Sequence, residues 1–212
     1  MIVVTGLPRT GTSVMVEILK KNGYYAGREI ELVGHKYRTE LSFLKDLHTS
    51  TLIAFGNILT FFKWENLFPF QKQAFESVNN FIKENQINVV KDNYLSPFFL
   101  VWKTINNELQ DAHFIWTRRD IEESTKSMLR LQESFGIQPS DFEFYNNAAK
   151  NLDSLQQDMM EYYVKDYTEI WLDDLLEDPE KYGSELSGKL GKTIDMSLIN
   201  RDETWEKTQI PQ

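Results

Sequence analysis

The sequence predicts an α/β fold in which helices cover both faces of a central parallel β-sheet, giving a three-layer α/β/α sandwich. The chain opens with a short apolar run, a glycine-containing loop and an amphipathic helical stretch. Short runs rich in β-branched and aromatic residues then recur, separated by helical stretches. Strands separated by helices favour parallel pairing, and such sheets bind ligands at the carboxyl ends of their strands.

Length and composition indicate one domain over residues 1–212. The chain is 41% hydrophobic and 26% charged, which suffices for a full core, and no repeat, low-complexity tract or Gly/Ser linker divides it. A net charge of −9 argues against a broad nucleic-acid surface or a basic membrane patch, because both need a surplus of Lys and Arg. Any anion must therefore be held locally.

The residue types present argue against disulfides, metal sites and membrane-spanning segments. The absence of cysteine excludes disulfides, thiolate metal sites and cysteine nucleophiles. The three histidines, His35, His48 and His113, are too scattered for a metal cluster, so we expect no metal site. The longest apolar runs, such as "FFLVW" at 98–102, are far shorter than the roughly 18 residues of a membrane span. We therefore expect a soluble, cytoplasmic protein without a membrane partner.

The chain up to about residue 85 contains one clear strand, one clear helix and a long insertion. Residues 2–5 read as a buried strand, and residues 12–22 as a helix that ends at Gly23, with apolar Val14, Met15, Ile18 and Leu19 on one face. A mostly helical insertion is expected at about 36–85. It contains the aromatic segment "FFKWENLFPF" at 61–70, which could line a hydrophobic acceptor site or form an ordinary core helix.

Three further strands are expected after this insertion. "INVVK" at 87–91 and "HFIWT" at 113–117 are rich in β-branched and aromatic residues, and helical stretches follow them at about 95–109 and 120–134. "DYTEIWL" at 166–172 reads as a fourth strand.

The loop "GLPRTGTS" between the first strand and the first helix has the features of an anion-binding site. Gly6 and Gly11 have the G-x-x-x-x-G spacing of a phosphate-binding P-loop and allow close approach of the backbone to an anion. Thr12 stands where a nucleotide triphosphatase carries Lys, so Arg9 is the only cation of the loop. The alternative is an ordinary turn between a strand and a helix. ATP is a less favoured ligand than another phosphate ester.

Four segments, in order, resemble sulfotransferases that use 3′-phosphoadenosine 5′-phosphosulfate (PAPS). "GLPRTGTS" looks like their 5′-phosphosulfate loop, and "RDIEESTKSMLR" looks like their 3′-phosphate motif, with Arg119 followed by Ser127 and with Ile121 where many members have Pro. "NVVKDNYLSPFF" resembles their lysine-containing strand end. "WLDDLLEDPEKYGSELSGKLG" resembles a C-terminal segment of bacterial members.

The resemblance implies the ligands and the residues that would bind them. PAPS would be the donor and adenosine 3′,5′-bisphosphate the product, with no metal required. The implied binding residues are Pro8, Arg9, Thr10, Gly11, Thr12, Ser13, Arg119, Ser127 and Trp171. A 3′-phosphate is a dianion, and one Arg with a nearby hydroxyl suits it. Arg118 is a rival for this role, Arg119 could instead pair with acids of its own segment, and Trp171 could be a core residue.

Sulfuryl transfer also needs a base for the acceptor and a cation at the transferred group. The resemblance favours Glu40 as the base, while His35, Asp92 and Glu31 are alternatives. Lys91 is a candidate cation or a solvated strand end. The acceptor would be a hydroxyl, or an amine, of a small molecule or glycan. The alternative functions are a P-loop kinase or nucleotide hydrolase with an altered loop, and a nucleotide-binding protein without catalysis.

Overall fold

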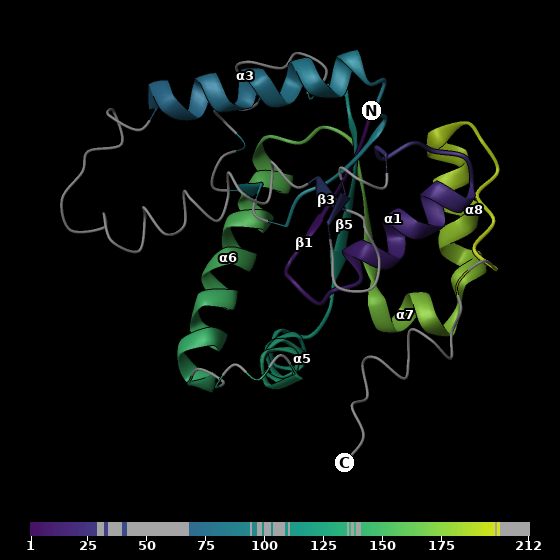
Figure 1. Cartoon of the computed structure of the whole chain (residues 1–212). Coiled ribbons are helices and arrows are strands. Elements are labelled where there is room, and N and C mark those ends of the chain that lie inside the picture. The colour runs from purple at the N-terminus through teal and green to yellow at the C-terminus, as the bar shows by residue number, and fades with distance from the viewer. Residues whose placement is uncertain are drawn as a thin grey trace.

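A computed structural model of the chain shows a four-stranded parallel sheet between helices (Figure 1). The structure describes residues 1–28, 32–33, 40–41, 68–93, 95–96, 99, 103, 109, 111–134, 136, 138, 141–197 and 199; for 32–33, 40–41 and 68–75 the description is of the backbone. The elements follow the order β1 Ile2–Gly6, α1 Thr12–Lys21, β2 Leu32–Val33, β3 Glu40–Leu41, α3 Phe68–Glu84, β4 Val89–Lys91, β5 His113–Arg118, α5 Ile121–Ser134, α6 Phe142–Tyr162, β6 Tyr167–Trp171, α7 Leu172–Glu177 and α8 Pro179–Leu190.

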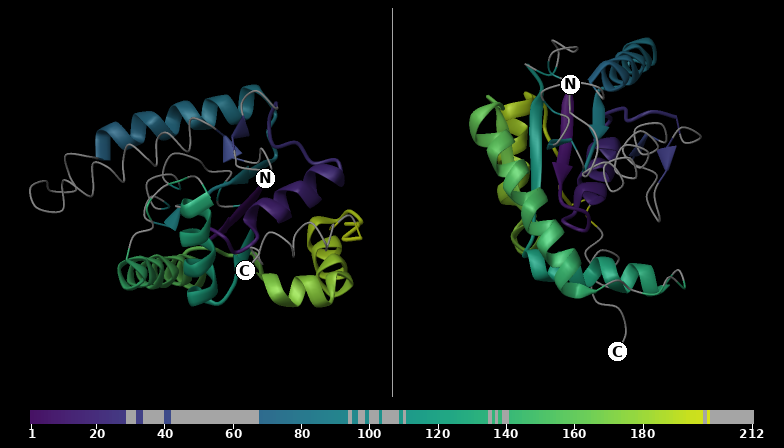
Figure 2. Two further views of the ribbon diagram at one scale, coloured as in Figure 1. Left: turned by 60° about the horizontal axis from the view of Figure 1, so that its bottom comes forward. Right: turned by 90° about the vertical axis from the view of Figure 1, so that its left-hand side faces the viewer.

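The main sheet has the order β4-β1-β5-β6, and each neighbouring pair is parallel. Strand β1 is therefore central, pairing with β4 on one side and β5 on the other. The predicted α/β fold and parallel sheet are confirmed. All carboxyl ends point the same way, and the views in Figure 1 and Figure 2 place the N-terminus at the opposite end of β1.

Two apolar clusters fill the spaces between the sheet and its helices. In β1, Val3 points to a cluster with α6 and the end of α3, whereas Val4 points to a cluster with α1, α7 and α8. This alternation is expected, because successive side chains of a strand point to opposite faces. The two clusters confirm the three-layer arrangement, with α6 on one side of the sheet and α1 and α8 on the other (Figure 1).

Most predicted elements lie at the expected positions. Helix α1 ends as predicted, because the N–H of Asn22 bonds the Ile18 carbonyl and Gly23 takes a φ of 83°. Within the expected insertion at 36–85, the described residues form β3, which pairs antiparallel with β2, and helix α3. The remainder of that insertion, including residues 61–67, and most of the helix expected at 95–109 lie outside the described residues. In the described part of the chain, no helix has the length and apolar character needed to cross a membrane.

Candidate active site

The loop between β1 and α1 is held in one conformation by contacts with β5 and α7. Gly6 has a φ of +152°, and a Cβ there would lie 2.2 Å from the backbone oxygen of Thr117. Gly11 has a φ of +96°, and its Cβ would lie 2.8 Å from the Cδ1 of Leu172. Both positions therefore require glycine. Thr10 contributes to the loop's shape, since its buried hydroxyl donates to the Leu7 carbonyl at 2.7 Å and lies 2.9 Å from the Thr117 hydroxyl.

The N-terminus of α1 has the properties of an anion site. Gly11 is the N-cap and has no side chain to cap the first turn, and that turn contains no acidic residue. The first N–H groups of a helix have no partner within the helix, and the helix dipole favours negative charge there. Thr12 is buried, whereas Pro8 and Ser13 are half-buried. The Thr12 hydroxyl lies 3.4 Å from the Nδ2 of Asn93, too far for a strong hydrogen bond.

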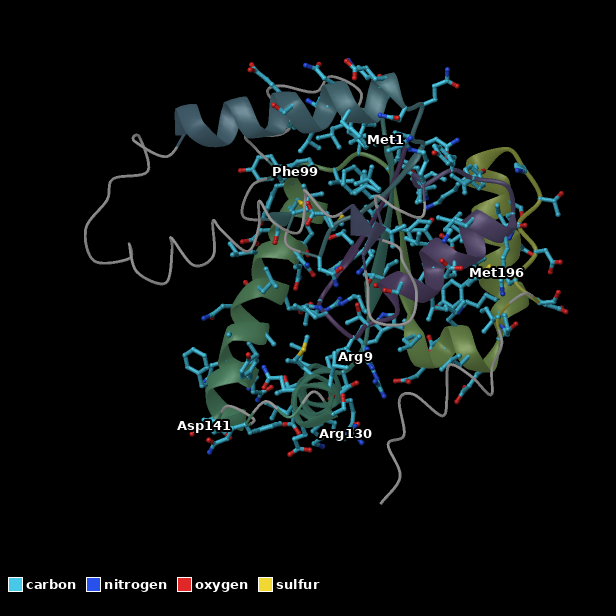
Figure 3. All side chains as sticks on the ribbon, in the orientation of Figure 1. Met1, Arg9, Phe99, Arg130, Asp141 and Met196 are labelled. Carbon is cyan, nitrogen blue, oxygen red and sulfur yellow. The ribbon has the colours of Figure 1, made fainter. Side chains whose placement is uncertain are left out.

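Arg9 joins the loop to helix α5. Its backbone takes a left-handed φ of 74°, which is uncommon outside glycine, and its Nε donates to the Ser127 hydroxyl at 3.0 Å. The resemblance described above predicts Arg9 at the 5′ end of a donor and Ser127 at its 3′-phosphate. The structure brings the two side chains together at the carboxyl end of the sheet, where Figure 3 labels Arg9.

The neighbouring residues Arg118 and Arg119 have different surroundings. Arg118 donates to Glu169 and to Asp153, each at 3.1 Å. Arg119 has a side chain only 9% exposed, yet its Nε and Nη1 have no hydrogen-bond partner. Its described ion pair is with the half-exposed Asp173, whose oxygen is 4.0 Å away. Arg119 is thus the arginine of this pair with donors available to a ligand.

The positive charges of the site are close enough to repel one another. The pKa of Arg9 is lowered by burial, and then by the nearby charges of Arg119 and Arg130. Arg130, on α5, was given no role by sequence reasoning, although it lies only three residues after Ser127. Three arginines thus gather at one place in a chain whose net charge is −9. Such a cluster favours a ligand with several negative charges.

Trp171 lies at the carboxyl end of β6, beside Arg118. The guanidinium carbon of Arg118 lies 4.3 Å from the ring centre of Trp116 and 4.8 Å from that of Trp171. The indole N–H of Trp171 donates to Glu169 at 3.0 Å, and the residue is 38% exposed. Trp171 is therefore a partly exposed aromatic surface next to Arg118, rather than a core residue.

The end of strand β4 lies on the other side of the loop. Lys91 pairs with Val4 of β1, and both Lys91 and Asp92 are buried. The carbonyl of Asp92 accepts from the Thr5 hydroxyl at 2.7 Å. The Asn93 carbonyl accepts from Nε2 of Gln156 at 3.0 Å, which ties this segment to α6. Gln156 is fully buried and its Oε1 has no partner; sequence reasoning did not single it out.

The candidate bases are described only in part. The backbone of Glu40 lies in β3, beside β4. His35 and Glu31 lie outside the described residues. Among the described residues, no three His, Asp or Glu side chains come together in a way that could hold a metal ion.

Comparisons with known proteins give matches in structure but none in sequence. No protein-family model matches the chain, and no curated protein is significantly similar in sequence. A sulfotransferase domain from the curacin biosynthetic pathway superposes with a TM-score of 0.59 at 14% identity, covering 95% of this chain and 77% of that one.

Two further solved structures agree. The sulfotransferase domain of the Synechococcus PCC 7002 olefin synthase gives a TM-score of 0.55 at 18% identity, covering 95% of this chain and 76% of that one. A sulfotransferase from Mycobacterium avium gives a TM-score of 0.52 at 15% identity, and the match covers 100% of this chain and 68% of that one. The chain therefore has the sulfotransferase fold, in agreement with the resemblance of its motifs.

Proposed function

We propose that the protein is a sulfotransferase that moves a sulfuryl group from PAPS to a hydroxyl, or an amine, of a small molecule or glycan. The observation that carries the proposal is the buried guanidinium of Arg119, whose Nε and Nη1 lack hydrogen-bond partners. Leaving buried N–H donors without a hydrogen-bond partner costs free energy. Two such donors on one guanidinium, close to two more arginines, therefore indicate an anionic ligand. The fold and the loop at the start of α1 support this interpretation.

The residues present fit a nucleotide with anionic groups at two positions. The backbone of the loop and the first turn of α1 would hold the 5′ end, whereas Arg119 and Ser127 would hold the 3′-phosphate. Trp171 would contact the adenine through its exposed ring. When bound, PAPS supplies the activated sulfuryl group.

The chain's own cations would favour the charge that develops during transfer. Arg9, bonded through Nε to Ser127, keeps its other guanidinium nitrogens for a ligand at the loop. Thr12 adds a hydroxyl at the helix start, and Lys91 lies at the neighbouring strand end. Positive groups fixed before the reaction stabilise a developing anion without reorganisation. We therefore propose that no metal is required.

The proposed base is Glu40, with His35, Asp92 and Glu31 as alternatives. Glu40 lies in strand β3, which is beside β4, and the carboxyl end of β4 is at Lys91. A base must come within hydrogen-bond distance of the acceptor oxygen, so Glu40 has to reach the loop from this strand. We expect Glu40→Gln, which is nearly isosteric, to lower the transfer rate about 10²- to 10⁴-fold while donor affinity stays unchanged. An unaltered rate in a sulfate-transfer assay would pass the role to one of the alternatives.

Binding of adenosine 3′,5′-bisphosphate without Mg²⁺ tests the proposal directly. Calorimetry should show binding in the presence of EDTA, and ATP with Mg²⁺ should bind more weakly. A kinase or nucleotide hydrolase would show the reverse order. Transfer of labelled sulfate from PAPS to a panel of acceptors then separates an enzyme from a protein that only binds nucleotide.

A further inference from the structure

Arg130 is the third arginine of the site, and neither motif gives it a role. It follows Ser127 by three residues on α5, and residues three apart on a helix are neighbours. Arg119 lies just before the first turn of the same helix. Ser127 therefore lies along the helix between two arginines, and its hydroxyl accepts from a third, Arg9, at 3.0 Å. Figure 3 labels Arg9 and Arg130 at the same end of the molecule.

The positive charge of Arg130 is not neutralised by a described carboxylate. Its Nε donates to the backbone carbonyl of Lys126 at 3.3 Å, within its own helix. Among the described residues, no acidic side chain lies within ion-pair distance of Arg130 or of Arg9. The arginines are nevertheless close enough to lower the pKa of Arg9, after the larger effect of burial.

One acidic residue of α5 lies in the field of both Arg119 and Arg130: Glu123, one turn before Ser127. It is paired with Lys126, whose Nζ lies 2.8 Å away. The pKa of Glu123 is lowered mainly by that hydrogen bond, with smaller contributions from the charges of Lys126, Arg119 and Arg130. Glu123 thus lies in the field of both arginines while its direct partner is Lys126. The charge of Arg130 remains available for a ligand.

We propose that Arg130 is a donor-selectivity residue that, with Arg119, flanks the phosphate bound by Ser127, so that the site selects a doubly charged 3′-phosphate. The inference rests on the proposed function. A phosphate monoester has a second pKa near 6 and carries about −1.5 to −2 charges at pH 7. One guanidinium with a hydroxyl can bind this group, but it balances only one of the negative charges, so a second guanidinium increases the preference for the dianion.

Binding of two nucleotides to matched variants tests this role. We expect Arg130→Ala to weaken binding of adenosine 3′,5′-bisphosphate roughly tenfold, the lower end for a hydrogen bond to a charged group, and to change binding of adenosine 5′-monophosphate less than about twofold. Lys126→Ala is the control, because it removes the same charge from an exposed position of the same helix. It should affect neither nucleotide. Arg130→Lys should restore part of the bisphosphate affinity, since it keeps the charge.

The pH dependence of affinity separates charge recognition from a structural role. For the unaltered protein, bisphosphate affinity should rise between pH 5.5 and 7.5 by more than the affinity for adenosine 5′-monophosphate does. Both phosphates of the bisphosphate lose a second proton near pH 6, so the excess over the monophosphate reports the 3′-phosphate, which the site prefers as a dianion. In Arg130→Ala this rise should be smaller. A role in helix packing alone would lower affinity equally at both pH values, which would overturn the proposal.

A measurement without ligand checks the placement of the charge. The Glu123 carboxyl pKa, followed by NMR, should be higher in Arg130→Ala, because a cation that favours the carboxylate is removed. An unchanged value, or equal losses for both nucleotides, would overturn the inference and leave the proposed function standing. Failure of the unaltered protein to bind the bisphosphate would overturn both.

Discussion

Two arginines adjacent in sequence, Arg118 and Arg119, differ in the direction of their side chains and therefore in their part in the site. Arg118 ends strand β5 and is held by Asp153 and Glu169, whereas Arg119 follows the strand and has unpaired donors. Neighbouring residues of an extended chain point to opposite sides, so one turns to α6 and the other towards the loop. Motif spacing favoured Arg119 and left Arg118 as a rival, because the partners that hold Arg118 are more than 30 residues away.

Substitution of these two arginines should therefore have different effects. Arg118→Met should lower the free energy of unfolding by about 1.5 to 3 kcal/mol, since it breaks bonds to two carboxylates that are mostly shielded from water. Arg119→Met should leave the unfolding free energy of the ligand-free protein unchanged or raise it, because it removes buried donors that have no partner. Urea denaturation followed by circular dichroism measures both.

Nucleotide binding provides the complementary measurement for Arg119. Arg119→Met should weaken adenosine 3′,5′-bisphosphate about 10- to 150-fold, corresponding to hydrogen bonds to charged groups, while adenosine 5′-monophosphate binds about as before. A marked loss of stability in Arg119→Met would mean that the side chain supports the fold instead of the ligand.

Among the elements, those with local signals were predictable and those set by distant contacts were not. The loop and helix α1 were predicted because Gly6, Gly11 and the apolar face of α1 are local features. Helix α6 was not predicted. It buries the polar residues Asn146 and Gln156, while large apolar residues on it are exposed: Phe144, Leu155 and Tyr162. Periodicity of apolar residues normally marks the buried face, so this helix gives a misleading signal.

In the site, too, residues marked by local sequence motifs were predictable, whereas contacts between distant segments were not. Arg9, Thr12, Arg119 and Ser127 were identified from motif spacing. The hydrogen bond between Arg9 and Ser127 joins residues 118 positions apart, and the contact of Gln156 with the end of β4 joins α6 to a strand 63 positions earlier. Such contacts exist only after the sheet has formed, so no local pattern reports them.

The loop element provides a matched pair of glycine substitutions. Gly6→Ala should destabilise the protein and abolish bisphosphate binding, because its Cβ would lie 2.2 Å from the Thr117 backbone oxygen. Gly188→Ala in α8 should stabilise by about 0.5 to 1 kcal/mol, since that position is helical and a Cβ there meets nothing within 4 Å. Thermal unfolding with and without bisphosphate measures both effects. Equal behaviour of the two variants would contradict the loop geometry.

At the scale of the whole molecule, the parallel sheet separates two tasks. Its carboxyl end carries the candidate site. Near its amino end, the buried His113 of β5 lies 2.7 Å from Asp166 through Nδ1 and 3.1 Å from the Thr168 hydroxyl through Nε2. These contacts join β5 to the chain of β6, and because they involve residues at the far end of the strands, we assign them to stability.

Asp166→Ala tests this separation. The substitution leaves the buried Nδ1 of His113 without its carboxylate partner, so the unfolding free energy should fall by about 1 to 3 kcal/mol. Affinity for adenosine 3′,5′-bisphosphate at a temperature where the variant stays folded should not change. A tenfold loss of affinity would show that the two ends of the sheet are coupled.

The central position of β1 has a consequence for the order of events during synthesis. This strand leaves the ribosome before both of its partners, and β5 follows it by about 110 residues, which at typical rates of elongation takes roughly 6 to 22 s. Until β5 emerges, β1 and its loop lack one of the two neighbouring strands of the finished sheet, and nascent chains in this condition are candidates for chaperone binding. Because every pairing in the main sheet is parallel and long-range, final assembly is expected to be slow compared with helix formation. The anion-binding loop, which precedes both partner strands of β1 in the sequence, is thus among the last parts of the sheet region to acquire its working shape.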